Sequence, residues 1–326
     1  MPELRQNVIL KKYSNYKIGG PARFFFEAKN IDEVKWAVEE ARKQKLKVFI
    51  LGGGTNLLIS DAGYDGLVLK PNISFLRRTG DEIEAGAGVS ITELLNYAIT
   101  HSLSGLEWAG GLPGTLGGAI RGNAGCFGGE IKDSVKEVES FDIERGEWRK
   151  RNNKECEFGY RNSVFKKPDG REVILSATFE LKNGNSAEIR KSILSKIKYR
   201  KSKQPLQYPN IGSIFKNVPL AQINADITQI DADTVRIHPR GNPRKSAFTV
   251  LVKTDPFPII PAAHLITLAG LKGTRSGGAM ISPKHGNFIV NVGNAKAADV
   301  KKLINLVKRK IKDKFGIKLE EEIVRV

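Results

Sequence analysis

Two glycine-rich segments are the residues of this sequence whose spacing points most directly to chemistry. Gly52–Asn56 follows a short apolar stretch, and glycines crowd the segment Gly110–Gly129. Backbone N–H groups can approach a phosphate closely where no Cβ stands in the way. Neither segment has the spacing of a dinucleotide fingerprint or of a Walker A loop, so neither is decisive alone. Together they could hold one extended diphosphate from two sides, with Thr55, Asn56 and Thr115 as side-chain donors.

The elements that must position these segments follow from the hydrophobic pattern. An apolar strand at 47–51 runs into the first segment, and a helix at 91–101, capped by Ser90 or Thr92, precedes the second. The second segment is too rich in glycine to be a helix or a central strand along its length. We predict further strands at 24–28, 66–70, 135–143, 147–150, 173–181, 213–216, 279–281 and 287–291, and a strand with a glycine-punctuated turn at 81–89. The strands at 135–181 are expected to lie in a mixed sheet. Further helices are predicted at 32–42 (capped by Asp32), 186–200 and 297–315.

A domain boundary is predicted near residue 200. Gln204-Pro205 and Pro209 follow a long basic helix, and prolines of this kind end helices and mark linkers. The remainder is a smaller α+β unit with an excursion at 218–262. We interpret that excursion as a hairpin of strands Thr234–His238 and Ala247–Lys253, joined by Pro239–Lys245 and followed by Asp255–Pro258.

The composition is that of a globular protein with a strong positive charge. The chain has 326 residues, 40% of them hydrophobic, and a formal net charge of +18. The basic residues concentrate at Lys191–Lys203 and Lys301–Lys318. Such charge can attract nucleic acid or steer a polyanionic small ligand such as a nucleotide sugar. In the second run Val300, Leu303 and Val307 recur at helical spacing, so we favour solvated helix faces and expect no nucleic-acid partner.

The expected location is the cytoplasm. No stretch of 18 apolar residues exists to cross a membrane, and the start at Met1–Asn7 lacks an apolar secretory core, so we expect no membrane partner. Cys126 and Cys156 are far apart and lack metal-ligand spacing, so they are interpreted as reduced thiols and no metal site is expected. We also expect a monomer.

Eight short motifs follow one another along nearly the whole chain: Asn15–Ala22, Leu51–Asp61, Gly105–Gly129, Gly159–Ser163, Gly212–Asn217, Ala269–Gly273, His285–Phe288 and Leu319–Glu322. In this order they resemble those of the UDP-N-acetylenolpyruvoylglucosamine reductase (MurB) family. Between Arg161 and Ser213 there is no room for the tyrosine-bearing lid of one branch of that family, so the chain resembles the branch without it. The excursion at 218–262 is longer than the usual link there.

The resemblance implies an α+β fold and a flavin reaction. It implies an FAD-binding domain of the vanillyl-alcohol-oxidase (PCMH) type at 1–200, in subdomains of about 1–70 and 71–200, and a substrate domain at 201–317, with 318–326 returning to the FAD half. FAD would be bound non-covalently and reduced by NADPH. The substrate would be a nucleotide sugar, UDP-N-acetylglucosamine enolpyruvate, reduced to UDP-N-acetylmuramate for peptidoglycan precursor synthesis.

Three residues match catalytic positions of the family. Reduction of an enol ether builds negative charge beside the substrate carboxylate, and that charge needs a cation, an acid and a proton. Arg161 would bind the carboxylate, because a guanidinium can do so in bidentate fashion. Ser213 would donate the proton, and Glu322 would hydrogen-bond the developing enediolate. Each also has an ordinary interpretation: a surface ion pair for Arg161, a strand end for Ser213 and a solvated glutamate run for Glu322.

Further positions match the family's ligand contacts. Cys126 could suggest a covalent flavin link, but a small buried thiol is the better interpretation, and His238, His264 and His285 are expected to be structural. The expected substrate contacts are Tyr160, Arg200, Lys203, Lys216 and Asn217. The expected cofactor contacts are Leu51, Gly52, Gly53, Gly54, Thr55, Asn56, Leu57, Gly111, Pro113, Gly114, Thr115, Gly118, Asn123, Ala124, Gly125 and Ile131.

Two other functions stay open at this stage. One is a different flavin enzyme on the same fold, such as an oxidase, which would need no proton donor at Ser213. The other is a basic nucleic-acid-binding protein without catalysis. We also hypothesise that the excursion at 218–262 replaces part of the missing lid, with a surface elaboration away from the site as the alternative.

Overall fold

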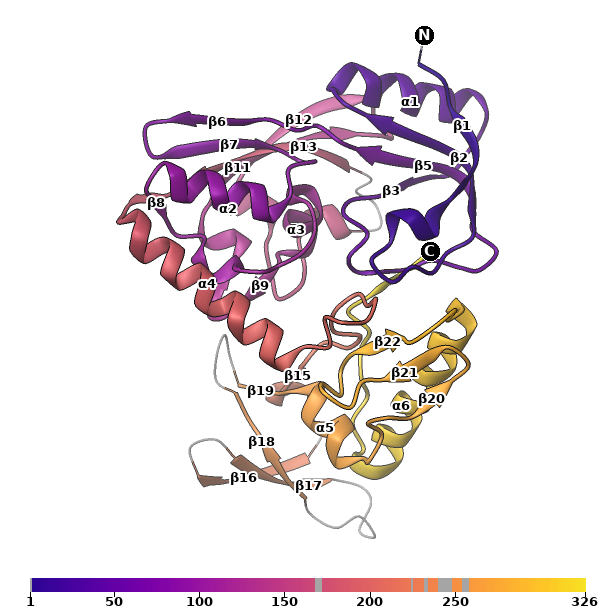
Figure 1. The fold of residues 1–326 in the computed structure, drawn as a ribbon, viewed down its shortest axis with the longest axis vertical. Coiled ribbons are helices and arrows are strands. Elements are labelled where there is room, and N and C mark those ends of the chain that lie inside the picture. The colour runs from indigo at the N-terminus through magenta and orange to yellow at the C-terminus, as the bar shows by residue number, and fades with distance from the viewer. Residues whose placement is uncertain (1, 168–171, 224, 232–233, 240–247, 254–257) are drawn as a thin grey trace. The chain divides into compact units, whose positions relative to one another are not determined.

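The computed structural model describes residues 2–167, 172–223, 225–231, 234–239, 248–253 and 258–326. They form two compact units, coloured along the chain in Figure 1, and each is described by itself. Unit 1 comprises Met1–Tyr13, Pro21–Thr55 and Gly63–Ser202; unit 2 comprises Ser14–Gly20, Asn56–Ala62 and Lys203–Val326.

Unit 1 contains a four-stranded sheet covered by one helix. The strand order is β1-β2-β5-β3, with β1 and β2 antiparallel and the other pairs parallel. The helix α1 packs on β2 and β5 (Figure 1). Its buried residues Val34, Ala37, Val38 and Ala41 recur at helical spacing, so one face of α1 joins the core. The bounds are β1 Arg5–Ile9, β2 Pro21–Ala28, α1 Ile31–Lys43, β3 Val48–Ile50 and β5 Tyr64–Pro71.

The expected cap of α1 was wrong by two residues. Asn30, not Asp32, is the N-cap: its backbone is extended, and its Oδ1 accepts a hydrogen bond of 2.9 Å from the Glu33 N–H. Asp32 lies in the first turn with Glu33, where negative charge is favourable to the helix dipole. Two adjacent residue types that both cap helices made this boundary ambiguous in the sequence.

A five-stranded sheet, order β12-β11-β13-β7-β6, completes the framework of unit 1. All four of its strand pairs are antiparallel, which corrects the expected mixed sheet. Its strand β6 was not predicted, because Arg77, Arg78 and Thr79 are exposed and give no apolar signal. The bounds are β6 Leu76–Thr79, β7 Glu82–Gly86, β11 Val135–Asp142, β12 Glu147–Asn152 and β13 Glu172–Glu180.

Three helices of unit 1 share a core with this sheet. Ser90 caps α2 in a capping box with Glu93, as the sequence allowed, and α4 continues three residues past the expected end. The bounds are α2 Ile91–Thr100, α3 Leu116–Gly122, α4 Ser186–Lys203, and the short strands β8 Leu103–Ser104, β9 Gly125–Cys126, β10 Gly129–Glu130 and β14 Lys182–Asn183. Single-turn 3-10 helices lie at Leu10–Tyr13, Glu107–Ala109, Ile131–Asp133, Lys154–Cys156, Val164–Lys166 and Leu220–Gln222.

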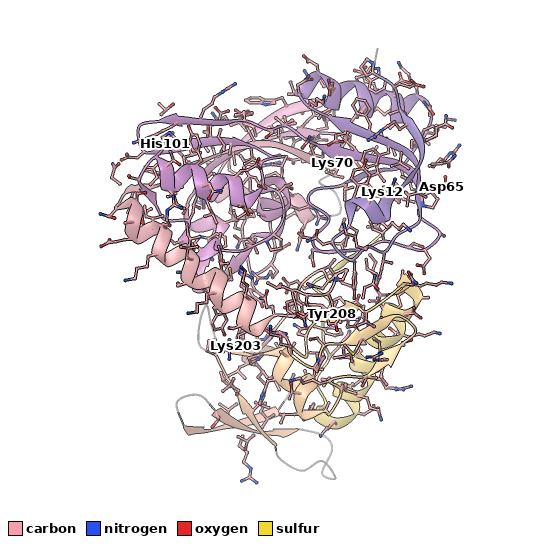
Figure 2. All side chains as sticks on the ribbon, viewed as in Figure 1. Lys12, Asp65, Lys70, His101, Lys203 and Tyr208 are labelled. Atoms are coloured by element: carbon pink, nitrogen blue, oxygen red, sulfur yellow. The ribbon has the colours of Figure 1, made fainter. Side chains whose placement is uncertain are left out.

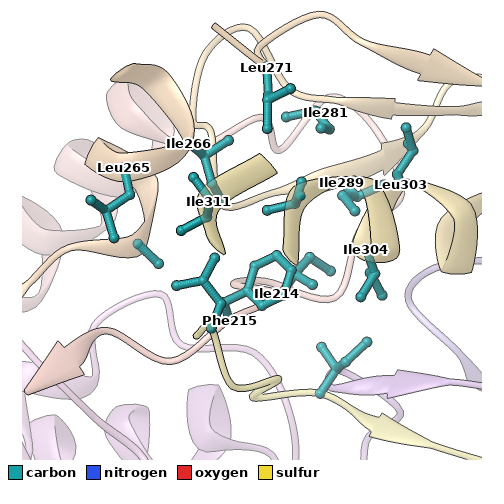
Figure 3. Close-up of a cluster of buried hydrophobic side chains, with 14 of the residues drawn as sticks. Ile214, Phe215, Leu265, Ile266, Leu271, Ile281, Ile289, Leu303, Ile304 and Ile311 are labelled. Carbon is teal, nitrogen blue, oxygen red and sulfur yellow. The ribbon is translucent and has the colours of Figure 1, made fainter. Parts of the chain in front are cut away.

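Unit 2 is built around one apolar cluster, part of which is drawn in Figure 3. Helix α6 has the bounds that its apolar spacing predicted, and Val300, Leu303, Ile304, Val307, Ile311 and Phe315 are all buried. The sheet β20-β21-β22 and helix α5 supply the facing side chains. The bounds are α5 Ala262–Leu268, β20 Arg275–Ser276, β21 Ala279–Ile281, β22 Ile289–Asn291 and α6 Ala297–Phe315.

The predicted strand at 213–216 was wrong. Only one isolated bridge, between Phe215 and Glu321, occurs there. Gly212 has a φ of +79°, a left-handed conformation that turns the chain just before Ser213. The side chain of Asn287 occupies one side of the segment, where a partner strand would otherwise stand.

The excursion at 218–262 is an integral part of unit 2. It contains a three-stranded antiparallel sheet, β16-β17-β18, and therefore one more strand than the expected hairpin. Val235, Ile237, Val250 and Val252 are buried in the unit 2 core. The expected connection at 240–245 and residues 255–257 lie outside the described residues. The bounds are β15 Val218–Pro219, β16 Ala225–Asp231, β17 Thr234–Pro239, β18 Phe248–Leu251 and β19 Ile259–Ile260.

Two short segments from the first fifth of the chain belong to unit 2. Strand β4 (Leu57–Leu58) pairs in parallel with β23 (Val324–Arg325). Asp61 accepts hydrogen bonds of 2.8 and 3.1 Å from the N–H groups of Ala297 and Ala298 and so caps α6. The hydroxyl of the fully buried Tyr16 donates a 2.8 Å hydrogen bond to the Ile289 carbonyl, and burial raises the pKa of Tyr16 far above its ordinary value.

We predict that Tyr16→Phe destabilises the protein by about 1–2 kcal/mol, because the buried Ile289 carbonyl loses its side-chain donor. Thermal unfolding measures the loss. Tyr208→Phe is the matched control, since Tyr208 is exposed. Equal melting temperatures for the Tyr16→Phe variant and the native protein would contradict this account.

Candidate active site

The two glycine segments expected to act together do meet in unit 1. A Cβ added to Gly53 would lie 2.7 Å from the Gly114 Cα and 2.9 Å from the Thr115 nitrogen, distances that no side chain can tolerate. Gly114 has a φ of +115°, and a Cβ there would lie 2.9 Å from the Thr55 Oγ1. Gly53 is therefore glycine because the two backbones touch, whereas Gly114 is glycine because of its positive φ and the nearby Thr55 side chain.

The second segment is fixed to the framework by its own backbone. The N–H groups of Leu116 and Gly117 donate to the carbonyls of Val89 and Ala87 at 2.8 and 2.9 Å. The Gly114 carbonyl accepts a 3.1 Å bond from the Ile91 N–H at the start of α2. These bonds fasten the segment to the end of β7 and the beginning of α2.

An open strip along α3 is suited to a ligand. A Cβ added to Gly122 would meet nothing within 4 Å, and one added to Gly118 would meet only the Thr115 Oγ1, at 3.7 Å. Glycine inside a helix costs about 0.5–1 kcal/mol relative to alanine, so Gly118, which has no packing neighbour that requires it, calls for another explanation. The hydroxyls of Thr55 and Thr115 make no hydrogen bond within the described part of the chain.

Other glycines of the second segment are explained by packing inside unit 1. A Cβ on Gly111 would lie 3.0 Å from the Arg200 Cδ on α4, and one on Gly129 would enter the Trp108 ring at 2.4 Å. Gly111 was expected to touch the cofactor, and its lack of a side chain is accounted for by α4. Pro113 between these positions is exposed, and Leu51 is buried with its N–H bonded to the Leu69 carbonyl.

Asn123 organises the loop that follows α3. It is fully buried with a φ of +40°, which asparagine tolerates. Its Nδ2 donates to Glu130 and to the Gly159 carbonyl, both at 3.0 Å, and its Oδ1 accepts from the Lys132 N–H. The Asn123 side chain, which was expected to contact the cofactor, therefore bonds other parts of the protein. The Ala124 carbonyl accepts a 2.9 Å bond from the Ile131 N–H, so these two expected cofactor residues pair with each other.

Arg161 is held beside this loop. Its Nη2 donates a 2.8 Å hydrogen bond to the Gly125 carbonyl, and its guanidinium lies over the Tyr160 ring, 5.3 Å from the centroid. The φ of +54° at Arg161 is uncommon for a residue with a long side chain, and such strain concentrates at functional sites. The Arg161 carbonyl accepts a 2.5 Å bond from the Lys166 amine.

Ser213 and Glu322 lie on adjacent segments of unit 2. The Glu322 N–H donates a 2.8 Å hydrogen bond to the carbonyl of Ile214, next to Ser213. The Ser213 hydroxyl makes no hydrogen bond with another described residue. Arg161 belongs to unit 1, so the structure assigns the three expected catalytic residues to their units without relating Arg161 to the other two.

The neighbours of Glu322 are engaged by cations. Glu321 bonds Lys308, and it receives two bonds from Arg325 at 2.7 and 2.8 Å. Burial acts to raise the pKa of Glu321, but Arg325 and Lys308 outweigh it and hold that pKa below its usual range. Glu320 pairs with Lys216 at 3.2 Å and is exposed. The glutamate run is therefore differentiated by its partners.

The residues expected to bind the substrate differ in their contacts and in their exposure. Arg200 is buried in unit 1, where its Nε donates to the Gly110 carbonyl at 2.9 Å and its Nη2 contacts the Cys126 Sγ at 2.8 Å. Lys203 is exposed at the end of α4 (Figure 2). In unit 2 the Asn217 Oδ1 accepts from the Ala262 N–H at the start of α5.

Asn56 and Leu57, expected at the cofactor, belong to unit 2, whereas Thr55 is the last residue of its segment in unit 1. The Asn56 Nδ2 donates a 3.0 Å bond to the Glu322 carbonyl, and the Asn56 carbonyl accepts one from the Val324 N–H. Leu57 pairs with Val324 in β23. Asn56 thus holds the segment that carries Glu322.

Phe127 is a further exposed residue of this region that the sequence did not predict as part of a site. It is 43% exposed at a φ of +52°, packs edge-on against Tyr199 at 5.4 Å and lies under the Arg200 guanidinium. A bulky exposed residue in this strained conformation indicates a functional surface. The adjacent positive φ of Gly128 marks the tight turn, but nothing in the sequence distinguishes Phe127 from an ordinary turn residue.

The environments of Cys126 and His285 shift their pKa values so that both side chains are uncharged near neutral pH. Burial raises the pKa of the Cys126 thiol despite the nearby Arg200 and Arg161 cations, so the thiol stays protonated near neutral pH. Burial, with the charges of Lys253 and Lys272, lowers the pKa of His285 to about 4. A neutral imidazole at pH 7 agrees with the structural interpretation of that residue.

Comparison with known proteins covers the whole chain. Residues 204–326 match the family model "UDP-N-acetylenolpyruvoylglucosamine reductase, C-terminal domain", and residues 22–151 match the model "FAD binding domain". The UDP-N-acetylenolpyruvoylglucosamine reductase of Caldanaerobacter subterraneus subsp. tengcongensis is 38% identical over 98% of this chain and 93% of that protein. The chain belongs to the UDP-N-acetylenolpyruvoylglucosamine reductase family. The predicted membership is confirmed.

Two further relatives agree with this membership. The reductase of Anoxybacillus flavithermus is 37% identical over 98% of this chain and 93% of that protein. The crystal structure of the MurB protein from Thermus caldophilus superposes with a TM-score of 0.74 at 30% identity, covering 100% of this chain and 99% of that one. The predicted fold class, an α+β chain with an FAD-binding domain of the PCMH type followed by the family's C-terminal domain, is confirmed. No helix in the described part of the chain has the length and hydropathy needed to span a membrane.

We predict opposite stability effects at two glycines of the FAD-binding domain. Gly118→Ala should raise the Tm of the apoprotein by about 1–4 °C, because alanine favours the helix and meets open space, yet it should weaken FAD binding. Gly53→Ala should lower both the Tm of the apoprotein and its affinity for FAD, because the added Cβ would lie 2.7 Å from the Gly114 Cα. Thermal unfolding and flavin fluorescence titration measure the two quantities. Unchanged FAD affinity in the Gly118→Ala variant would show that α3 does not line the cofactor site.

Proposed function

We propose that this protein is an FAD-dependent reductase that converts UDP-N-acetylglucosamine enolpyruvate to UDP-N-acetylmuramate with NADPH, in peptidoglycan precursor synthesis. The observation that carries the proposal is the contact of Gly53 with Gly114 beside the open strip of Gly118 and Gly122, in a chain that aligns along its length with reductases of this name. We keep the expectation of a monomeric, cytoplasmic enzyme.

Residues of unit 1 would hold the flavin. Backbone N–H groups of Gly52–Thr55, Gly114, Thr115 and Gly118, with the hydroxyls of Thr55 and Thr115, would provide donors for a diphosphate without any basic side chain. FAD held there would supply the two-electron redox chemistry that links oxidation of NADPH to reduction of the enolpyruvyl group. The half-buried thiol of Cys126, with its raised pKa, is not needed as an attachment point.

Arg161 would neutralise the substrate carboxylate. Reduction at the terminal carbon of the enolpyruvyl group places negative charge on the neighbouring carbon, which bears that carboxylate. A guanidinium held at the Gly125 carbonyl and stacked on Tyr160 is oriented before substrate arrives, so little reorganisation is required. Binding, rather than proton transfer, is the role that fits an arginine.

Ser213 and Glu322 would act on the developing charge. The Ser213 O–H bond breaks as a C–H bond forms at the carboxylate-bearing carbon, and water returns a proton to the serine oxygen. Glu322 would hydrogen-bond the developing enediolate. The support is their placement on two segments joined by the bond from the Glu322 N–H to the Ile214 carbonyl, together with the Ser213 hydroxyl that no described residue engages.

An anaerobic two-step experiment tests the proposal. NADPH should bleach the flavin absorbance, and UDP-N-acetylglucosamine enolpyruvate should restore it with formation of UDP-N-acetylmuramate. NADH run in parallel determines the preferred donor. A reduced flavin that the enolpyruvyl substrate leaves unoxidised would contradict the proposed function.

We predict that Ser213→Ala leaves flavin reduction by NADPH unchanged and slows reoxidation by the enolpyruvyl substrate by about 10²–10³-fold, because only the second half-reaction needs its proton. Stopped-flow absorbance resolves the two halves. Ser195→Ala, at an exposed position of α4, is the matched control. Equal slowing of both halves would argue against a proton donor at Ser213.

A further inference from the structure

The amide of Asn287 grips one residue of the segment that follows Ser213. Its Oδ1 accepts a 3.0 Å hydrogen bond from the Phe215 N–H, and its Nδ2 donates a 2.8 Å bond to the Phe215 carbonyl. The Asn287 main-chain carbonyl accepts a further 2.9 Å bond from the Ile214 N–H. One side chain thus reproduces the paired donor and acceptor that a neighbouring strand would offer.

The opposite side of the same segment is held by the C-terminal residues. The Ile214 carbonyl accepts from the Glu322 N–H at 2.8 Å, and the Lys216 N–H donates to the Glu320 carbonyl at 2.9 Å. The segment 214–216 therefore runs between Asn287 and the 320–322 segment. Ile214 connects the two sides directly, because its N–H bonds Asn287 and its carbonyl bonds Glu322.

The residues that make these hydrogen bonds are buried, so their polar groups depend on one another for partners. Asn287 is 3% exposed, while Ile214 and Phe215 are 0% and 1% exposed in the cluster of Figure 3. A buried amide must find partners for both its donor and its acceptor, and Asn287 has both on Phe215. Gly286 lets the chain approach closely, since a Cβ there would lie 3.0 Å from the Ala263 carbonyl of α5.

The hydrogen bonds that fix residues 214–216 do not extend to Ser213 within the described residues. It follows Gly212, whose φ is +79°, and it belongs to no strand. Its position is set by the Gly212 turn, with a 3.1 Å bond from the Gly212 N–H to the Asn210 Oδ1, and by the fixed Ile214 on its other side. A shift at Ile214 would move the Ser213 hydroxyl and Glu322 relative to each other.

We propose that Asn287 is a positioning residue that sets the alignment of Ser213 with Glu322 for protonation of the substrate. This inference rests on the proposed function. Asn287 does not touch the reacting atoms; it acts through the backbone of Ile214 and Phe215. Loss of the clamp affects the proton-transfer half of the cycle and leaves flavin reduction by NADPH intact.

The first test is Asn287→Ala, studied in the FAD-loaded full chain by stopped-flow under anaerobic conditions. Reoxidation by UDP-N-acetylglucosamine enolpyruvate should slow about 10–100-fold, in line with a displaced donor, with flavin reduction by NADPH unchanged. In the Ser213→Ala background the same substitution should cost nothing more, because the group it positions is gone. Additive losses, or equal loss in both halves, overturn the proposal.

Asn291→Ala is the matched control. Asn291 is also a buried asparagine, 8% exposed, four residues along the chain in β22. Its amide bonds the Tyr16 carbonyl and the N–H groups of Gly293 and Ala295, none of which borders Ser213. Its substitution should lower Tm without favouring one half-reaction. A selective loss of reoxidation here as well would assign the effect to general packing.

Asn287→Asp decides the case if the alanine variant fails to fold. A protonated aspartic acid keeps one acceptor and one donor for Phe215, whereas the ionised form turns a negative oxygen toward the Phe215 carbonyl. The ratio of the variant's reoxidation rate to that of the native enzyme should therefore rise as pH falls through the carboxyl pKa. A ratio that does not change with pH overturns the proposal.

Amide hydrogen exchange separates this proposal from the proposed function. The Phe215 amide should be protected in the native chain and in Asn291→Ala, and it should lose protection in Asn287→Ala or in ionised Asn287→Asp. This readout needs no substrate. Unchanged Phe215 protection in both Asn287 variants refutes the clamp, whereas a native enzyme that does not react with the enolpyruvyl substrate refutes the function.

Discussion

The backbone contact between Gly53 and Gly114 is the constraint around which the FAD-binding domain is arranged. Two loops from separate strand systems meet with no side chain between them, and a methyl group at Gly53 would lie 2.7 Å from the opposing Cα. The second loop is held in place by the bonds of Leu116 and Gly117 to the residues that follow β7, and the first loop packs directly against it. A diphosphate can then be bound by backbone N–H groups that are ordered before it arrives.

Unit 2 obtains its order by a different means. Several backbone groups of its loops, and of the N-terminus of α6, are satisfied by side chains: Asn287 bonds Phe215, Asn56 bonds Glu322, and Asp61 caps α6. Such bonds link segments that are distant in sequence, so they fix loops that are not held by the backbone hydrogen bonds of a β-sheet. The proposed proton donor, Ser213, lies in one of these loops.

This difference explains what the sequence could and could not predict. Helix α6 was predicted to the residue because its apolar positions alone define the buried face. The prediction of a strand at 213–216 was wrong because the side chain of Asn287, 72 residues from Phe215 in the chain, takes the place of a partner strand. No local sequence pattern indicates such a contact. Strand β6 was missed because its side chains are exposed. The two glycine segments do meet, but the absence of a side chain at Gly111 is explained by its contact with α4.

The three glutamates of the run 320–322 differ in the groups that they contact. Leu319 and Ile323 are buried, so alternation along the chain places Glu321 on the same inward side, and its carboxylate must be compensated there. Lys308 and Arg325 provide that compensation and keep Glu321 ionised. An ionised carboxylate bound by two cations cannot serve as an acid, and Glu320 is paired at the surface. Of the three glutamates, Glu322 is the one whose backbone is bonded next to Ser213, which is why the proposed acid is assigned to it.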